Sequence, residues 1–329
     1  MIANSSLRPP LHILGAGSIG QLWAISIRSK FPEYPITLLL RGSRRDDGSD
    51  SSRSFRLKKS AFTIPAEVVV PVQYVDDDIQ DPIQTLLVTT KSYQASDAVQ
   101  SVMHRLADTA MPSRVVLLCN GALSVQDELL PIMKDGVSLI LAMTTHGAYR
   151  EEIPSDKTIP SSCLVHAGVG KAFIQEGHDD LAHLWEQAGL NCSTLSTIAV
   201  EELLWKKLAA NCVINPLTAL FQCTNGELLL EPSFPELQQE LISEVARVAQ
   251  ASFRDDTLDE DSLRRFVVQV IDDTKENKSS MLQDVLHQKR TEIDHLNGYI
   301  VRKGRSLGIE CPANEDLVSR IKELPAVRR

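Results

Sequence analysis

Three glycines near the start of the sequence have the spacing of a phosphate-binding turn. The segment HILGAGSIG, residues 12–20, contains G-x-G-x-x-G directly after an expected strand and at the start of an expected helix. In such a motif the first glycine permits a tight turn, the second lets the backbone approach a pyrophosphate, and the third lets the helix pack closely on the strand. We therefore expect the helix N-terminus to bind a dinucleotide. The residues expected to contact it are Gly15, Ala16, Gly17, Ser18, Ile19 and Gly20. The alternative is a strand-to-helix turn that needs glycine only for its own geometry.

The residue after the second expected strand distinguishes between two nicotinamide cofactors. Ile36–Leu40 is followed by Arg41, about 20 residues beyond the glycine motif, where an acidic residue would bind the ribose 2′-hydroxyl of NAD. An arginine pairs instead with the 2′-phosphate of NADP. Arg44 and Arg45 can reinforce this contact. The sequence therefore predicts NADPH as the cofactor, with a solvated loop as the alternative for these arginines.

Two further expected strands end in polar residues. Thr85–Thr90 is followed by Lys91, and Val115–Cys119 is followed by Asn120. Ligands of open α/β sheets lie outside the carboxyl ends of the strands. Lys91 and Asn120 are therefore expected at the ribose or nicotinamide end of the cofactor. The alternative is a surface lysine and an Asn-Gly turn.

A stripe of polar residues lies in the most apolar segment of the second half. Lys207, Asn211 and Asn215 recur at i, i+4 and i+8, so they share one face of an expected helix. Pro216 removes a helical N–H directly after Asn215 and can free a backbone carbonyl. A lysine beside two carboxamides can hold a 2-oxo acid and polarise its carbonyl group. The alternative is an exposed lysine with two asparagines bonded locally.

A second polar cluster is less specific. Asn277 to Asp284 reads NKSSMLQD, and Thr291 to Gly298 reads TEIDHLNG. Ser280 or Asp284 can simply cap a helix, and Glu292 can be a solvated charge. These residues alone do not distinguish such structural roles from a role in binding or catalysis.

The elements that must position these residues change in type along the chain. The first half alternates short apolar runs with helical stretches, which is typical of βαβ units and a parallel sheet. The expected strands are His12–Leu14, Ile36–Leu40, Thr85–Thr90, Val115–Cys119 and Ser138–Met143, with edge strands within Cys163–Ile174. The expected helices of this half are Ile19–Ser29, Ala95–Leu106 and Leu181–Gly189. From about Thr197 the apolar residues follow helical spacing. The expected helices there are Ile198–Leu220, Glu236–Ser252, Leu263–Asp273, Met281–Leu307 and Glu315–Leu324.

These patterns predict an α/β protein of two domains. Residues 1–195 are expected to form an NADP-binding Rossmann-type domain with a doubly wound parallel sheet, and residues 196–329 an all-helical domain for substrate and catalysis. The stretch Arg41–Lys59, rich in Arg, Asp, Ser and Gly, is expected to be a solvated loop for most of its length.

Composition excludes several classes of protein. The chain has 329 residues and a formal net charge of −9, which argues against a broad nucleic-acid surface. No apolar run has the length of about 18 residues that a membrane helix needs. The six cysteines are far apart and form no C-x-x-C pair, so we expect no metal site and a cytoplasmic location.

The separated motifs together resemble those of the ketopantoate reductase (2-dehydropantoate 2-reductase) family. The resemblance extends from the glycine turn to Pro312, and its most specific parts are Trp205 to Leu220, Ser279 to Asp284 and Thr291 to Gly298. Thr144 to Ala148, reading TTHGA, adds to it. The departure is the long polar insertion after Arg41, which bears on the adenine end of the cofactor.

The resemblance implies reduction of 2-dehydropantoate to (R)-pantoate with NADPH, on the way to pantothenate and coenzyme A. By the same resemblance Lys207 is the catalytic lysine that acts as general acid, and Glu292 is its acidic partner. The implied substrate-binding residues are Asn211, Asn215, Asn277 and Ser280, and the implied cofactor contacts include Arg41, Lys91 and Asn120.

Two other functions remain open at this point. One is an NADP-dependent oxidoreductase for another 2-oxo or β-hydroxy acid, and the other is a non-enzymatic NADP-sensing protein of the same fold. In each case the expected partner is a small molecule rather than nucleic acid or membrane, and the chain is expected to be a monomer or a homodimer.

Overall fold

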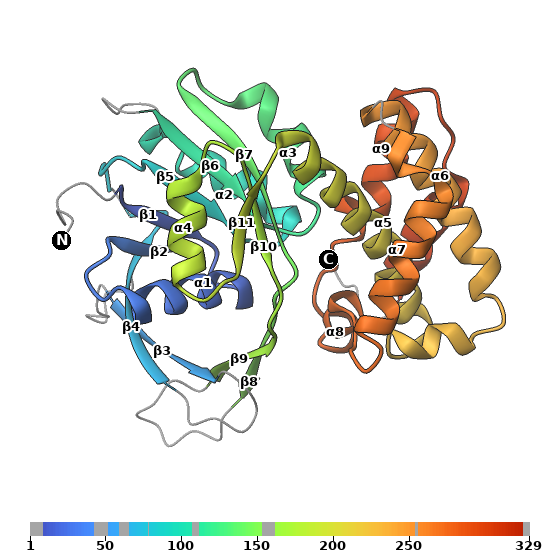
Figure 1. Ribbon diagram of the computed structural model, residues 1–329, viewed down its shortest axis with the longest axis horizontal. Helices are drawn as coiled ribbons and strands as arrows, with labels where there is room; N and C mark the ends of the chain where they lie inside the picture. Colours follow the sequence, from blue (N-terminus) through green and yellow to red (C-terminus); the bar gives the residue numbers. More distant parts are fainter. Residues whose placement is uncertain are drawn as a thin grey trace. The chain divides into compact units, whose positions relative to one another are not determined.

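The computed structural model describes residues 9–42, 52–58, 66–77, 79–106, 112–152, 162–253 and 256–324 (Figure 1). The chain divides into two compact units, Met1–Val200 and Glu201–Arg329. The division falls inside a long helix, α5 (Thr197–Phe221), a few residues beyond the boundary expected from the sequence.

The centre of the first unit is a parallel sheet. Its strands are β1 (Leu11–Leu14), β2 (Ile36–Leu40), β4 (Ala66–Tyr74), β5 (Thr85–Val88), β6 (Ser113–Leu117) and β7 (Val137–Thr144). They lie in the order β4-β2-β1-β5-β6-β7 and all pairs are parallel. This is the strand order of dinucleotide-binding sheets. The predicted Rossmann-type fold class is therefore confirmed.

Further strands extend this sheet at both edges. Beyond β4 lie β3 (Ser52–Lys58), β9 (Ser162–Gly168) and β8 (Gly147–Glu152), and beyond β7 lie β10 (Ala172–Gln175) and β11 (Cys192–Leu195). The pairs β3–β4, β8–β9 and β7–β10 are antiparallel. Figure 1 shows β3, β9 and β8 curving below α1 (Ser18–Lys30), and all three strands contact this helix.

The presence of β3 corrects the loop predicted for Arg41–Lys59. Ser52–Lys58 is a strand, and Phe55 and Leu57, two residues apart, pack on the hydrophobic core. Charged residues on both sides of this pair hide the alternation in the sequence. Residues 43–51 and Lys59 lie outside the described residues.

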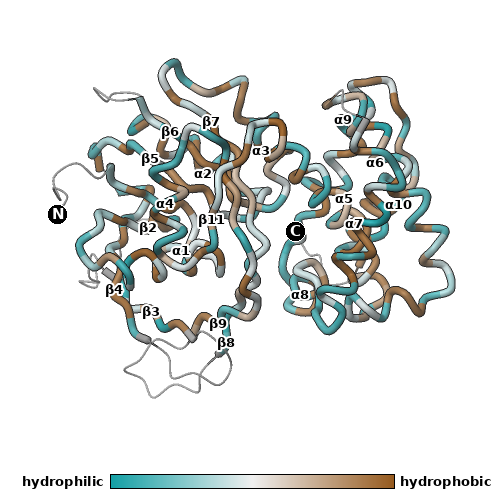
Figure 2. Tube along the Cα trace, in the orientation of Figure 1, coloured by the Kyte–Doolittle hydropathy of each residue, from teal (hydrophilic) through white to brown (hydrophobic). Residues whose placement is uncertain are grey.

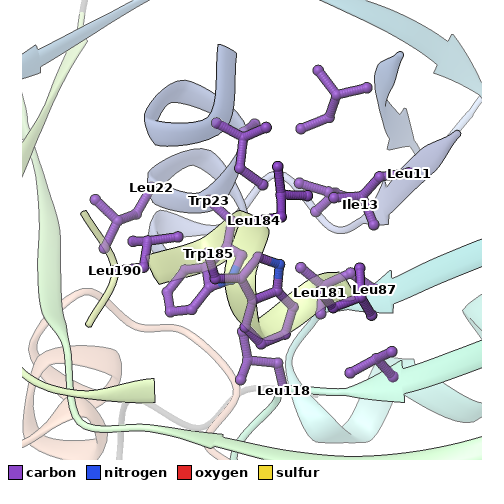
Figure 3. Packing of buried hydrophobic residues seen from close by; sticks show 14 of the residues in the cluster. Leu11, Ile13, Leu22, Trp23, Leu87, Leu118, Leu181, Leu184, Trp185 and Leu190 are labelled. Carbon is purple, nitrogen blue, oxygen red and sulfur yellow. The ribbon is translucent and has the colours of Figure 1, made fainter. Parts of the chain in front are cut away.

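Helices cover the sheet and enclose an aromatic core. Besides α1 they are α2 (Ser92–Ser101), α3 (Ala122–Leu129) and α4 (Asp179–Gln187), with short 3-10 turns at Met103–Arg105 and Leu130–Ile132. Trp23 of α1 and Trp185 of α4 meet edge to face, with ring centroids 5.7 Å apart (Figure 3). Leucines of α1 and α4 and apolar residues of the strands surround this pair, and the central strands show hydrophobic colour in Figure 2. The two indoles bury a large apolar area, which stabilises the packing of α1 against α4.

The second unit is helical, as predicted. After α5 follow α6 (Phe234–Phe253), α7 (Glu260–Asp273), α8 (Ser280–Leu286), α9 (Asn297–Ser306) and α10 (Pro312–Glu323). Short 3-10 turns occupy Gly226–Leu230, Asp256–Leu258 and Ile293–His295.

The predicted single helix Met281–Leu307 is wrong. The chain leaves α8 through Gln288, whose φ of 54° is left-handed, and the Lys289 N–H bonds the carbonyl of Asp284 at 2.7 Å. A left-handed residue ends an α-helix because the next N–H groups turn back onto the last carbonyls. Two helices and a 3-10 turn replace the expected one.

Among the described residues no helix is long and apolar enough to cross a membrane. The same part of the chain contains no group of three or more His, Cys, Asp or Glu side chains placed to hold a metal ion.

Candidate functional site

Four predicted cofactor segments meet at the carboxyl edge of the parallel sheet. The glycine turn follows β1, Arg41 follows β2, Lys91 lies three residues after β5, and Asn120 lies three residues after β6. The register places the last residues of these strands side by side, with Leu14 paired to Val88 and Val88 paired to Leu117. The structure thus brings together segments that are far apart in the sequence.

Two of the three glycines are required by the turn itself. Gly15 has a φ of +111°, and a Cβ there would lie 2.8 Å from the Thr90 nitrogen. A Cβ on Gly20 would lie 2.0 Å from the Gly15 carbonyl oxygen. Thr89 locks this geometry, because its hydroxyl donates to the Gly15 carbonyl at 2.9 Å and its N–H donates to Leu14 at 2.9 Å. No pattern in the sequence indicates this role of Thr89.

Gly17 has the opposite character. It lies at the N-cap of the 13-residue helix α1, and a Cβ there would contact only the Thr89 carbonyl oxygen, at 3.7 Å. The backbone at Gly17 therefore faces open space beside the first N–H groups of the helix. These groups have no partners within the helix and attract anions. The turn has the room and the donors that a dinucleotide pyrophosphate needs.

The other predicted cofactor residues line the same edge. Arg41 is exposed directly after β2, and Lys91 is half-buried at the N-cap of α2. Asn120 is half-buried and precedes Gly121, whose φ of 63° turns the chain into α3. Arg44 and Arg45 lie outside the described residues. The cofactor roles of Arg41, Lys91 and Asn120 stay predictions that this placement supports.

In the second unit, the predicted polar stripe lies on α5. Lys207 and Asn211 are half-buried and Asn215 is buried, at 7% exposure. The neighbouring Lys206 instead forms a surface salt bridge with Glu202, with an N–O distance of 2.6 Å. The two adjacent lysines therefore have different surroundings, and only Lys207 belongs to the stripe.

The carbonyl freed by Pro216 is that of Cys212, four residues earlier. It accepts a hydrogen bond from the side-chain amide of Asn297, at 2.9 Å. Asn297 is fully buried and also donates to Asn314 at 2.9 Å, and Asn314 in turn donates to Glu244. The freed carbonyl thus belongs to a buried structural network and is not available to a ligand.

The start of α8 is held against α5 by a serine next to the predicted one. Ser279 is buried, caps α8 by accepting from the Leu282 N–H at 3.1 Å, and bonds the Thr218 hydroxyl at 2.7 Å. Ser280 is the exposed first residue of α8. The structure therefore gives Ser279 the positioning role, and the substrate role of the exposed Ser280 stays a prediction.

Asn277 and Glu292 differ sharply in exposure. Asn277 is exposed, and its carbonyl accepts the Asn225 N–H at 2.9 Å. Glu292 is 4% exposed and directly precedes the turn Ile293–His295. A carboxylate so deeply buried has to be compensated by polar neighbours or by a ligand.

Asn225 is a candidate that the sequence analysis missed. It is buried, and its amide donates to the Thr274 hydroxyl at 2.9 Å. Its Oδ1 is also buried and has no hydrogen-bond partner among the described residues. A buried acceptor without a partner is costly, so a donor on a ligand is its natural complement. The Asn-Gly pair at 225–226 reads only as a turn in the sequence.

Comparison with known proteins decides the family. Residues 11–177 match the family model described as Ketopantoate reductase PanE/ApbA, and residues 199–324 match the model of its C terminal part. The 2-dehydropantoate 2-reductase of Shigella flexneri is 32% identical, over 95% of this chain and 94% of that protein. The chain belongs to the ketopantoate reductase family. The resemblance expected from the sequence is confirmed, and the protein is an oxidoreductase.

Solved structures of the ketopantoate reductase family and its neighbours agree with this fold. A family member from Ralstonia eutropha JMP134 has a TM-score of 0.77 at 25% identity, and the match covers 96% of this chain and 98% of that one. D-mandelate dehydrogenase in a ternary structure with NADH and anilino(oxo)acetate has a TM-score of 0.76 at 18% identity, covering 95% and 96% of the two chains. The latter likeness is one of fold.

Proposed function

We propose that this protein reduces 2-dehydropantoate to (R)-pantoate with NADPH, in the synthesis of pantothenate and coenzyme A. The observation that carries the proposal is the face of α5 formed by Lys207, Asn211 and Asn215, in a chain of the ketopantoate reductase family. The fold neighbour D-mandelate dehydrogenase binds NADH, which supports a nicotinamide cofactor.

In this proposal the first unit binds the cofactor. The N-terminus of α1 at Gly17 and Ser18 takes the pyrophosphate, and Arg41 takes the 2′-phosphate. Lys91 and Asn120 hold the ribose and nicotinamide end. When bound, NADPH supplies the hydride that C2 of the keto acid receives.

The helical unit binds and activates the keto acid. Lys207 donates a hydrogen bond or proton to the C2 oxygen, where negative charge develops, and a positioned acid of this kind contributes about 10²- to 10⁴-fold. Asn211 and Asn215 orient the substrate on the same helix face. Ser280 and Asn277 bind its carboxylate, and Glu292 orients the substrate hydroxyl or Lys207. Fixed orientation keeps C2 in a geometry that can react.

The test is an assay of NADPH oxidation by the purified protein with 2-dehydropantoate. The loss of absorbance of the reduced nicotinamide measures the rate. We expect turnover that is faster with NADPH than with NADH. A panel of other 2-oxo acids tests the competing substrate class. Faster turnover of another acid would replace the substrate in this proposal, and NADPH binding without turnover of any acid would favour a sensing protein.

A further inference from the structure

Arg150 contacts the glycine turn although its strand is several strands away from β1 in the sheet. Arg150 lies on β8, at the outer edge of the 11-stranded sheet, whereas the turn follows β1 near the middle. Because β3, β9 and β8 curve below α1 (Figure 1), β8 returns to this helix. The guanidinium of Arg150 donates through Nη2 to the carbonyl of Ala16. The same carbonyl accepts from Gln21 of α1 at 2.9 Å.

The register of the β8–β9 hairpin aims Arg150 at the turn. Arg150 is paired with Leu164 of β9, and Ala148 shares its face of β8 because the two are two residues apart. Ala148 and Leu164 both pack on the core beneath α1. Arg150 therefore projects from the inner face of the hairpin toward the glycine turn, and its side chain stays exposed.

A histidine pair fixes the base of this hairpin. His146 Nε2 lies 2.9 Å from the Leu190 carbonyl and must donate to it, so Nδ1 is an acceptor. That nitrogen lies 2.9 Å from His166 Nε2, which donates to it. Burial lowers the pKa of His146, which disfavours the charged ring in which both nitrogens would donate. The hairpin is a firm support for the arginine.

The charge of Arg150 has no acidic partner in the described part of the chain. Arg114 pairs with Asp180 and Lys206 pairs with Glu202, but no described carboxylate forms a salt bridge with Arg150. A guanidinium has five N–H donors in a fixed fork that matches phosphate oxygens. One donor holds Ala16, between Gly15 and Gly17, and others remain for a ligand. The positive charge of Arg150 thus lies beside a turn whose backbone N–H groups attract anions.

We propose that Arg150 binds the pyrophosphate of the dinucleotide, opposite the N-terminus of α1. This inference rests on the proposed function, because it takes the glycine turn as the cofactor site. It divides the phosphates between two arginines: Arg150 for the pyrophosphate, common to NADPH and NADH, and Arg41 for the 2′-phosphate of NADPH alone. Arg150 is then a cofactor-binding residue from a strand outside the dinucleotide-binding core.

The experiment measures dissociation constants of NADPH and NADH by nucleotide fluorescence, without keto acid, at low and high salt. The variant is Arg150→Gln, whose amide can still donate to the Ala16 carbonyl but carries no charge. We expect both nucleotides to bind about tenfold or more weakly, as for loss of a hydrogen bond to a charged group. The salt dependence of binding should also become weaker, because one ionic contact is lost. Arg53→Gln is the matched control, since Arg53 is exposed on β3 and contacts Tyr74.

Several outcomes separate this inference from others. Arg150→Lys should recover part of the affinity, and a lysine variant as weak as the glutamine variant would overturn the role of charge. A loss confined to NADPH would move Arg150 to the 2′-phosphate and overturn the proposal, as would unchanged affinity for both nucleotides. If the unaltered protein binds neither nucleotide, the proposed function itself fails, and this inference fails with it.

Discussion

Asn297 donates its side-chain amide to the carbonyl of Cys212, the backbone acceptor that Pro216 leaves without a helical partner. The distance is 2.9 Å, and Asn297 is fully buried. A proline inside a helix normally costs about 3 kcal/mol, partly because it removes one hydrogen bond. The asparagine from α9 restores that bond from outside, so α5 runs through Pro216 without ending. The helix that carries Lys207 and Asn215 therefore continues past this proline to Phe221.

Asn297→Ala should lower the free energy of unfolding of the helical unit by about 2–6 kcal/mol. The change leaves the Cys212 carbonyl and Asn314 Oδ1 buried without this donor, and each such group costs about 1–3 kcal/mol. Urea titration followed by circular dichroism measures the loss. In a Pro216→Ala background the new N–H can serve Cys212, so the cost of Asn297→Ala should fall. Equal costs in the two backgrounds would contradict the proposed repair.

Gly17→Ala and Gly20→Ala should fail in different ways. At Gly17 the new methyl group meets only the Thr89 carbonyl at 3.7 Å, and the φ of −67° suits alanine. We expect a normally stable protein whose affinity for NADPH falls at least tenfold, since the methyl group occupies the space for the pyrophosphate. At Gly20 the methyl group lies 2.0 Å from the Gly15 oxygen. The turn must then open, at a cost of about 1–3 kcal/mol or more. Melting temperature and nucleotide titration separate the two effects; a destabilised Gly17→Ala with intact binding would contradict them.

The sequence predicts the parallel sheet well because its strands are almost entirely apolar. Ile36–Leu40 is found with the expected bounds, and four further parallel strands shift by one or two residues at one or both ends. The sixth parallel strand, β4, was not expected from the sequence. The strand β3 has only Phe55 and Leu57 to show alternation, among Arg, Ser and Lys, so its pairing partners decide its structure. The sequence gives no signal for the helix break at Gln288 either, because apolar residues continue at helical spacing on both sides of it.

The residues of the candidate site also differ in how well the sequence predicts their placement. The shared helix face of Lys207, Asn211 and Asn215, which are four residues apart along the chain, can be predicted from helical spacing alone. Contacts between distant elements cannot. Thr89 holds Gly15, and Arg150 reaches Ala16, only because the strands β5 and β8 come back to the turn. Nothing in a single sequence reports such long-range register.

Arg41→Ala should change the choice of cofactor. The arginine follows β2, next to β1 in the sheet, where a 2′-phosphate would lie. Loss of a charge-assisted contact to phosphate should weaken NADPH binding about tenfold or more and leave NADH binding within about twofold. Fluorescence titration with both nucleotides measures the ratio. If both weaken alike, Arg41 does not contact the 2′-phosphate.

His12 should make the first unit less stable in mild acid. Burial, and then the charge of Arg105, lower its pKa from 6.5 to about 4, while Asp81 acts in the opposite direction. The unfolded chain therefore binds a proton below about pH 6.5, whereas the folded chain does not until about pH 4. Stability from this group is complete above pH 6.5 and falls by about 3 kcal/mol as the pH drops to 4. His12→Gln should remove this part of the slope in unfolding experiments between pH 4 and 7. An unchanged slope would show that His12 titrates normally.

Lys207→Ala and Lys206→Ala provide the sharpest comparison, because the two lysines are adjacent but differ in role. Lys206 is tied to Glu202 in a surface salt bridge, which contributes about 0–1 kcal/mol. Its loss should leave turnover almost unchanged. Lys207 lies on the face shared with Asn211 and Asn215, so its loss should lower kcat about 10²- to 10⁴-fold while NADPH affinity stays the same. Steady-state kinetics with 2-dehydropantoate and a separate nucleotide titration measure both quantities. If Lys206→Ala lowered kcat as much as Lys207→Ala, or if Lys207→Ala mainly weakened NADPH binding, the general-acid assignment would be wrong.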